Sequence, residues 1–173
     1  MLAFDLETTG LDPFRDSVTC AAAYDPDAGI DRAFLFQCGD DPEEFMALLD
    51  AADRLCAFNG ARFDIPFLQH SLRASPERAQ AWRLKLHDVY EGCRLALCVT
   101  FPLKALLALN GLDGKTGSGA EAVMMAREGR WQELADYCQH DTRMTHRVSS
   151  LERILLPKTH GLYMDASGGF WQS

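Results

Sequence analysis

Two carboxylates, Asp5 and Glu7, stand two residues apart in an otherwise apolar segment at the start of the chain. In an extended strand, residues i and i+2 point to the same face about 6.6 Å apart, so the two acids share one face. The apolar Leu2, Phe4 and Leu6 then occupy the opposite face. Carboxylates at this spacing can converge on one cation, and an acidic pair in an apolar strand needs such a partner. The alternative is an edge strand whose acidic face is solvated.

A third carboxylate, Asp64, follows the turn-forming pair Asn59-Gly60. Asn-Gly after an apolar strand predicts a tight turn, which puts Asp64 in the first turn of the next helix. The same position has a purely structural explanation, because an Asp near a helix N-terminus is stabilised by the helix dipole. The segment alone leaves both roles open.

A fourth carboxylate, Asp141, falls on the apolar stripe of a long helix expected near the C-terminus. The stripe has alternating steps of three and four residues and comprises Trp131, Leu134, Cys138, Asp141, Thr145, Val148 and Leu151. Tyr137 lies one turn before Asp141 on the same face. An inward-facing carboxylate is costly unless it is paired, hydrogen-bonded or bound to a metal, so Asp141 is a candidate functional acid. A buried ion pair with an Arg is the alternative.

Other polar residues in these regions give weaker signals. The segment DGKTG around Lys115 resembles part of a phosphate-binding loop, but Leu109 stands where that loop requires Gly. Lys115 is therefore kept only as a candidate contact to a substrate phosphate. His140 and His146 fall off the face of Asp141, and we expect them at the surface or its boundary. Asp88 is either a further acid near the site or the N-cap of a helix.

The hydrophobic pattern predicts the elements that must position these side chains. Strands are expected at residues 1–6, 18–24, 30–37 and 54–58, with a further candidate at 84–88. Helices are expected at residues 41–52, 63–73, 77–82, 89–97, 101–109, 119–127 and 130–155. Three strands, a helix, a strand and then helices indicate an α/β domain, with a mixed sheet covered by helices.

Composition restricts the class of protein. The chain has 173 residues, 47% of them hydrophobic, and 17 basic against 25 acidic side chains give a formal net charge of −8. This is the balance of one soluble globular domain, and no apolar stretch reaches the roughly 18–20 residues that span a membrane. The acidity argues against binding duplex nucleic acid by broad phosphate neutralisation. It does not exclude an enzyme of nucleic acids whose carboxylates surround metal ions.

The cysteines indicate the cellular compartment of the protein, and the pattern near the C-terminus indicates where its domain ends. The six cysteines form no C-x-x-C pair and no zinc-finger spacing, and the N-terminus carries no signal peptide. We therefore expect free thiols and a cytoplasmic or other reducing compartment. One domain is expected over residues 1–156. Residues 157–173 have no clear period and are expected to form a tail, or a strap packed by Phe170 and Trp171.

Taken together, the three acidic segments resemble a known set of motifs. FDLETTG at residues 4–10, NGARFD at 59–64 and YCQHD at 137–141 resemble, in this order, the exonuclease motifs of the DEDD superfamily of 3′→5′ exonucleases. That superfamily includes RNase D-like enzymes and polymerase proofreading domains. Tyr137, four residues before Asp141, resembles the pattern of the Tyr subclass. The His subclass has His five residues before the last Asp, where this chain has Asp136. The resemblance covers about residues 1–150, and its last part is similar to exonuclease domains related to family B polymerases and helicase-associated nucleases.

The resemblance implies a ribonuclease H-like fold, with a central mixed five-stranded sheet flanked by helices, and phosphodiester hydrolysis with two divalent cations. Oxygen ligands favour Mg²⁺ or Mn²⁺. By resemblance, Asp5, Glu7 and Asp141 would hold the metal that activates water. Asp5 would bridge to a second metal that Asp64 supports. Tyr137 would orient the attacking water.

For the substrate, the resemblance implies a single-stranded DNA or RNA 3′ end, with DNA slightly favoured, and release of 5′-mononucleotides. Leu11 and Phe63 would lie beside the terminal base, although core packing explains both equally well. Asn59 would be a polar contact to the substrate or a turn-former. The first strand begins at Met1, which favours a free-standing small protein or a tightly trimmed domain. The alternatives are a polymerase proofreading domain and a non-catalytic module of the same fold that binds nucleic acid or protein.

Overall fold

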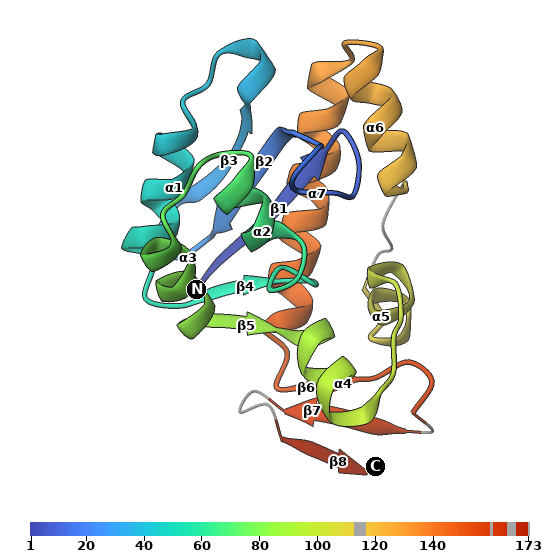
Figure 1. Cartoon of the computed structure of the whole chain (residues 1–173). Helices are drawn as coiled ribbons and strands as arrows, with labels where there is room; N and C mark the ends of the chain where they lie inside the picture. Colours follow the sequence, from blue (N-terminus) through green and yellow to red (C-terminus); the bar gives the residue numbers. More distant parts are fainter. Residues whose placement is uncertain (113–116, 160, 166–168, 173) are drawn as a thin grey trace.

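The acidic pair of the first segment lies on the central strand of a five-stranded sheet. The computed structural model describes residues 1–112, 117–159, 161–165 and 169–172. Its main sheet has the strand order β3-β2-β1-β4-β5 (Figure 1). The strands are β1 (Leu2–Thr8), β2 (Val18–Asp25), β3 (Ile30–Leu35), β4 (Leu55–Ala57) and β5 (Leu86–Asp88). β2 is antiparallel to β1 and β3, whereas β1, β4 and β5 run parallel, so the expected mixed sheet is confirmed.

Helices cover this sheet, as the sequence predicts. In the described residues they are α1 (Pro42–Ala51), α2 (Asp64–His70), α3 (Pro76–Leu84), α4 (Val89–Leu97), α5 (Leu103–Leu109), α6 (Gly119–Arg127) and α7 (Trp131–Ser149). A short 3-10 helix, Phe36–Cys38, follows β3, where the sequence predicted more strand. Helix starts use the expected chemistry: Asp41 accepts the N–H of Glu43 at α1, and Ser118 forms a capping box with Glu121 at α6. No described helix is long and apolar enough to cross a membrane.

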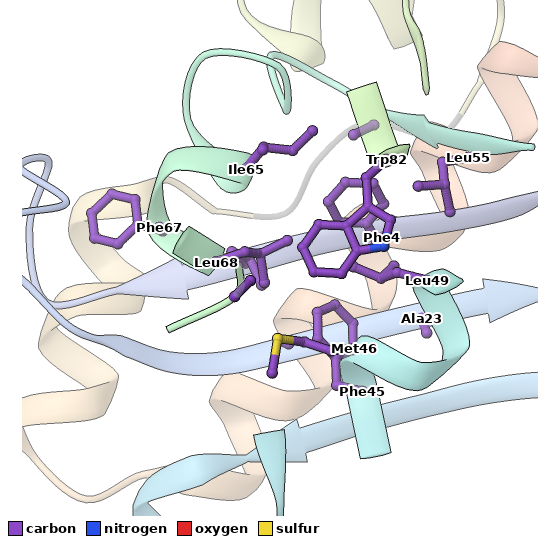
Figure 2. Packing of buried hydrophobic residues seen from close by; sticks show 14 of the residues in the cluster. Phe4, Ala23, Phe45, Met46, Leu49, Leu55, Ile65, Phe67, Leu68 and Trp82 are labelled. Carbon is purple, nitrogen blue, oxygen red and sulfur yellow. The ribbon is translucent and has the colours of Figure 1, made fainter. Parts of the chain in front are cut away.

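Alternation along β1 separates an apolar face from an acidic face. Phe4 packs on one face with Phe45 of α1 and Trp82 of α3, and all three are fully buried (Figure 2). The opposite face of β1 and β2 packs against α7. Because side chains alternate, Asp5 and Glu7 point toward this helix and away from the aromatic core.

The C-terminal part of the chain corrects the sequence prediction. Helix α7 ends at Ser149 instead of continuing to residue 155, and Arg153–Leu155 forms strand β6. β6 pairs with β7 (Leu162–Asp165), which pairs with β8 (Phe170–Gln172), in an antiparallel three-stranded sheet. Residues 153–155 alternate exposed, buried and exposed, as in a strand. The helix prediction was wrong here because a pattern of three residues does not distinguish a strand from the end of a helix.

This second sheet packs on an apolar cluster formed by α4, α5 and the C-terminal half of α7. Asn110, just after α5, holds β6 in place: its side chain accepts the N–H of Leu155 at 2.8 Å and donates to the carbonyl oxygen of Leu155 at 2.9 Å. Phe170 packs against the cluster, whereas Trp171 is 56% exposed. Of the two aromatic residues expected to pack on the domain, Phe170 therefore does so and Trp171 does not.

Candidate active site

Asp5 and Glu7 lie under α7, close to a cysteine that the sequence did not single out. A carboxylate oxygen of each acid and the thiol of Cys138 lie within 4.8 Å of one another. Glu7 is 8% exposed, and β1 is flanked by β2 and β4. The alternative of a solvated edge strand is therefore wrong, and the two acids form a partly buried pair in the middle of the sheet.

The other two predicted acids reach the same place from different elements. Asp141 of α7 is 1% exposed and Asp64, the first residue of α2, is 2% exposed. Both line one cavity of about 470 Å³ together with Asp5 and Glu7. Four carboxylates from three segments far apart in the sequence therefore face one cavity.

Local backbone geometry brings Asp64 to this cavity. Asn59 has a φ of +67°, and the turn that it starts leads directly into α2. A Cβ on Gly60 would collide with the Cβ of Ala57, so this turn needs glycine. A Cβ there would also come 3.4 Å from a carboxylate oxygen of Asp64, so the backbone at Gly60 lies close to the acid.

The surroundings of Asp64 favour a bound cation. Burial, and then the charges of Asp5 and Asp88, raise the pKa of Asp64 well above its usual range. Its Oδ1 atom is buried and has no hydrogen-bond partner among the residues that the structure describes. A divalent cation would supply a partner for this oxygen and a positive charge beside the carboxylates.

The donor set fits a hard cation better than a soft one. Burial raises the pKa of the Cys138 thiol well above its usual range, which disfavours the thiolate. The thiol donates its proton toward the main-chain oxygen of Asp5, 3.6 Å away. Four carboxylates stand against this single thiol, and carboxylate oxygens suit Mg²⁺ or Mn²⁺.

Tyr137 lies beside this group of acids but faces a neighbouring cavity. Its ring is 6% exposed, and a Cβ on Gly117 would approach ring atom Cε2 to 2.8 Å. Tyr137, Glu121 and His140 line a second cavity of about 420 Å³, which shares Gly117 with the first. The glycine is needed there because any side chain would meet the ring.

The predicted substrate contacts fall in different places. Leu11 and Phe63 line the 470 Å³ cavity; Leu11 is 84% exposed, which rules out core packing for it, whereas Phe63 also packs on Phe67. Asn59 forms the turn and is not among the residues that line the cavity. Lys115 lies outside the described residues. Lys104 of α5, which the sequence reading did not select, lines the cavity wall.

Asp88 has a role that the sequence showed only in part. It caps α4 by accepting the N–H of Glu91 at 3.1 Å, as one reading predicted. Its carboxylate also accepts the N–H groups of Asn59 and Ala61, each at 3.0 Å. Burial raises the pKa of Asp88. One half-buried side chain thus joins β5, α4 and the turn that leads to Asp64.

The family of the chain follows from its sequence as a whole. The sequence pattern of the RNase H superfamily matches residues 2–151, a span that contains β1 to β5 and all four carboxylates. The chain belongs to the RNase H superfamily. Its sheet order and flanking helices are those of an RNase H-like domain.

Two solved structures share this RNase H-like fold at low sequence identity, and a third is less similar. The family B DNA polymerase from the hyperthermophilic archaeon Pyrobaculum calidifontis has a TM-score of 0.62 and 20% identity over 84% of this chain. A nuclease in its apo form has a TM-score of 0.57 and 24% identity, also over 84% of this chain. Escherichia coli exonuclease I with a 5cy-dT13 oligonucleotide has a TM-score of 0.45 and 19% identity over 79%. The chain spans 23%, 68% and 41% of these three proteins. No curated protein sequence matches it.

Replacing Asp88 by Asn should loosen this RNase H-like domain at the turn before Asp64. The amide has one acceptor oxygen where the carboxylate uses two, so a buried N–H of the turn meets an NH₂ group instead of an oxygen. We expect a loss of about 1–3 kcal/mol in the free energy of unfolding. Thermal unfolding measures it, with Asp41→Asn at the start of α1 as the control, because Asn is an equally good N-cap. Equal melting temperatures for both variants would show that the bonds to the turn contribute nothing.

Proposed function

We propose that this chain is a metal-dependent 3′→5′ exonuclease that hydrolyses phosphodiester bonds at the 3′ end of single-stranded nucleic acid. The observation that carries the proposal is the meeting of Asp5, Glu7, Asp64 and Asp141 in one cavity. A buried group of like charges is costly unless cations neutralise it. The order and spacing of these residues resemble the DEDD motifs, which supports the same reaction.

In this proposal the four carboxylates hold two Mg²⁺ or Mn²⁺ ions. When bound, the ions activate water and neutralise charge on the phosphate. Tyr137, one turn before Asp141, orients the attacking water through its hydroxyl. The Cys138 thiol donates toward the main-chain oxygen of Asp5 beside these ligands.

The cavity wall suggests how a strand end binds. Leu11 and Phe63 offer apolar surface to the terminal base. Lys104 offers a positive charge to a phosphate, and Lys115 remains a second proposed phosphate contact. Stacking and backbone contacts of this kind tolerate any sequence, which suits release of 5′-mononucleotides from an unpaired end. In this proposal Asn59 forms the turn that positions Asp64 and does not contact the substrate.

The proposed enzyme also has expected domain limits, a cellular compartment and a preference between DNA and RNA. Residues 1–156 contain every proposed ligand, and the chain after residue 156 adds β7, which pairs with β6, and β8, which pairs with β7. All six cysteines are free thiols, which fits a reducing intracellular compartment. DNA is slightly favoured over RNA as substrate. Parallel incubation of labelled single strands of DNA and RNA of equal sequence with Mg²⁺ tests this preference, and faster loss of the RNA would reverse it.

Mn²⁺ is expected to raise the melting temperature of the protein without substrate. An ion that binds only the folded state stabilises it by RT ln(1 + [L]/Kd), about 2.7 kcal/mol at a hundredfold excess over Kd. The unfolded chain competes little because the ligands are far apart in sequence. Differential scanning fluorimetry with Mn²⁺ and with EDTA measures the shift, and Asp5→Asn should remove most of it. An unchanged melting temperature at millimolar Mn²⁺ would argue against a preformed metal site.

Without metal, Asp64→Asn is expected to stabilise the protein at neutral pH. The folded state raises the pKa of Asp64, so stability is lost as pH rises from the unfolded value, about 3.9, through the higher folded value. The neutral amide avoids this loss. A gain of one kcal/mol would raise the melting temperature by about 2–4 °C in a domain of this size, and the gain should vanish near pH 4. A constant difference between variant and wild type at all pH values would contradict the assignment to Asp64.

A further inference from the structure

The loop between β1 and β2 exposes a large aromatic side chain next to the candidate active site. Phe14 is 76% exposed, and Leu11, three residues earlier, is 84% exposed. Leu11 lines the 470 Å³ cavity. Three residues of chain span at most about 11 Å, so one strand that enters the cavity past Leu11 can also reach Phe14.

Hydrogen bonds within the loop hold Phe14 in its exposed position. Asp16 accepts the N–H of Asp12 at 2.9 Å, and Asp12 accepts the N–H of Phe14 at 3.0 Å. A Cβ on Gly10 would collide with the Asp16 carboxylate, so the loop closes tightly at this glycine. The acidic groups of the loop are directed at its own main chain, while the aromatic ring points outward.

The ring of Phe14 meets a second exposed ring. The centroids of Phe14 and His70 are 4.1 Å apart, at an interplanar angle of 41°. His70 is the last residue of α2 and is itself exposed. The N–H of Val18 donates to Ser71 Oγ at 2.9 Å, which ties the end of the loop to the end of α2. Neither ring is in the core, so the pair adds little to folding and leaves aromatic surface open to solvent.

The charges beside this pair suit a nucleic-acid strand. Arg15 follows Phe14 directly, and its side chain is 86% exposed and forms a long ion pair of 3.6 Å with Asp12. Arg73, three residues after His70, is also exposed. These guanidinium groups offer phosphate contacts on a chain whose net charge is −8.

We propose that Phe14 and His70 form a stacking surface for an unpaired base of the substrate strand, on the 5′ side of the terminal nucleotide. This proposal rests on the proposed exonuclease function. Base stacking on an aromatic ring is insensitive to sequence and supplies affinity that an acidic surface cannot gain by phosphate neutralisation. The surface therefore favours strands of several nucleotides over very short substrates.

Substrate length gives the test. For a 12-nucleotide DNA strand, Phe14→Ala should raise KM about 5–100-fold with kcat nearly unchanged, and Phe14→Trp should keep the wild-type value. For the p-nitrophenyl ester of thymidine 5′-monophosphate, which has no second base, both variants should match the wild type. Leu84→Ala on α3 is the control, because Leu84 is 79% exposed and is not among the residues that line the cavity. A wild-type KM for Phe14→Ala on the long strand, or equal losses on both substrates, would overturn the proposal.

A binding measurement separates this proposal from the function on which it rests. Fluorescence anisotropy of a labelled 12-nucleotide strand in Ca²⁺ reads affinity without turnover. If the wild type hydrolyses neither substrate, the proposed function fails, and weaker binding by Phe14→Ala and His70→Ala would still support the stacking surface. Equal binding by wild type and both variants would refute it, and would leave a protein-docking role as the explanation of the exposed rings.

Discussion

Asp141→Asn is expected to lower the rate of strand hydrolysis by at least about 10²–10³-fold while the fold is retained. Asn has nearly the same shape as Asp, so α7 keeps its packing, but one metal-binding charge is lost from the cavity. Asp5→Asn and Glu7→Gln should each have an effect of the same size, because these acids face the same cavity.

The rate of single-strand hydrolysis at saturating Mg²⁺ measures this effect, with melting temperature as the check on folding. Asp53→Asn is the control, since this exposed acid lies outside the residues that line the 470 Å³ cavity. A purified Asp141→Asn protein with near-normal turnover would disprove the ligand assignment.

Tyr137→Phe is expected to lower the rate by about 10–10³-fold, less than the loss of any metal-binding acid. Phe keeps the ring against Gly117 and removes only the hydroxyl, so folding should not change. Tyr24→Phe is the matched control because Tyr24 packs on His146 and is not among the residues that line either cavity. A wild-type rate for Tyr137→Phe across the pH range would show that the tyrosine is only packed beside Asp141.

The features of the site that follow from periodicity could be predicted from sequence. Alternation along β1 put Asp5 and Glu7 on one face, and the helical stripe turned Asp141 inward; the structure has both acids under α7 and Asp141 at 1% exposure. Asn59-Gly60 marked the turn before Asp64. In each case a local repeat or turn signal determines which way a side chain points.

Features that depend on contacts between distant segments could not be predicted. The hydrogen bonds from Asn59 and Ala61 to Asp88 join residues 29 and 27 positions apart, and the sequence around Asp88 indicates a helix cap or a further acid near the site but not these bonds. The strand at residues 153–155 depends on a partner strand and on Asn110, 45 positions away from Leu155. Lys104 reaches the cavity because α5 packs there, which no local pattern shows.

A site that removes nucleotides from a free 3′ end must shorten a linear strand and leave a closed circle intact. A 5′-labelled single strand of DNA and a covalently closed single-stranded circle are incubated separately with the protein and Mg²⁺, beside the Asp5→Asn variant. We expect the wild type to shorten the linear strand one nucleotide at a time from its 3′ end and to release 5′-mononucleotides. The circle should stay intact, and the variant should give no products from either substrate. Cleavage of the circle, or a linear strand left intact by the wild type, would contradict the proposed function.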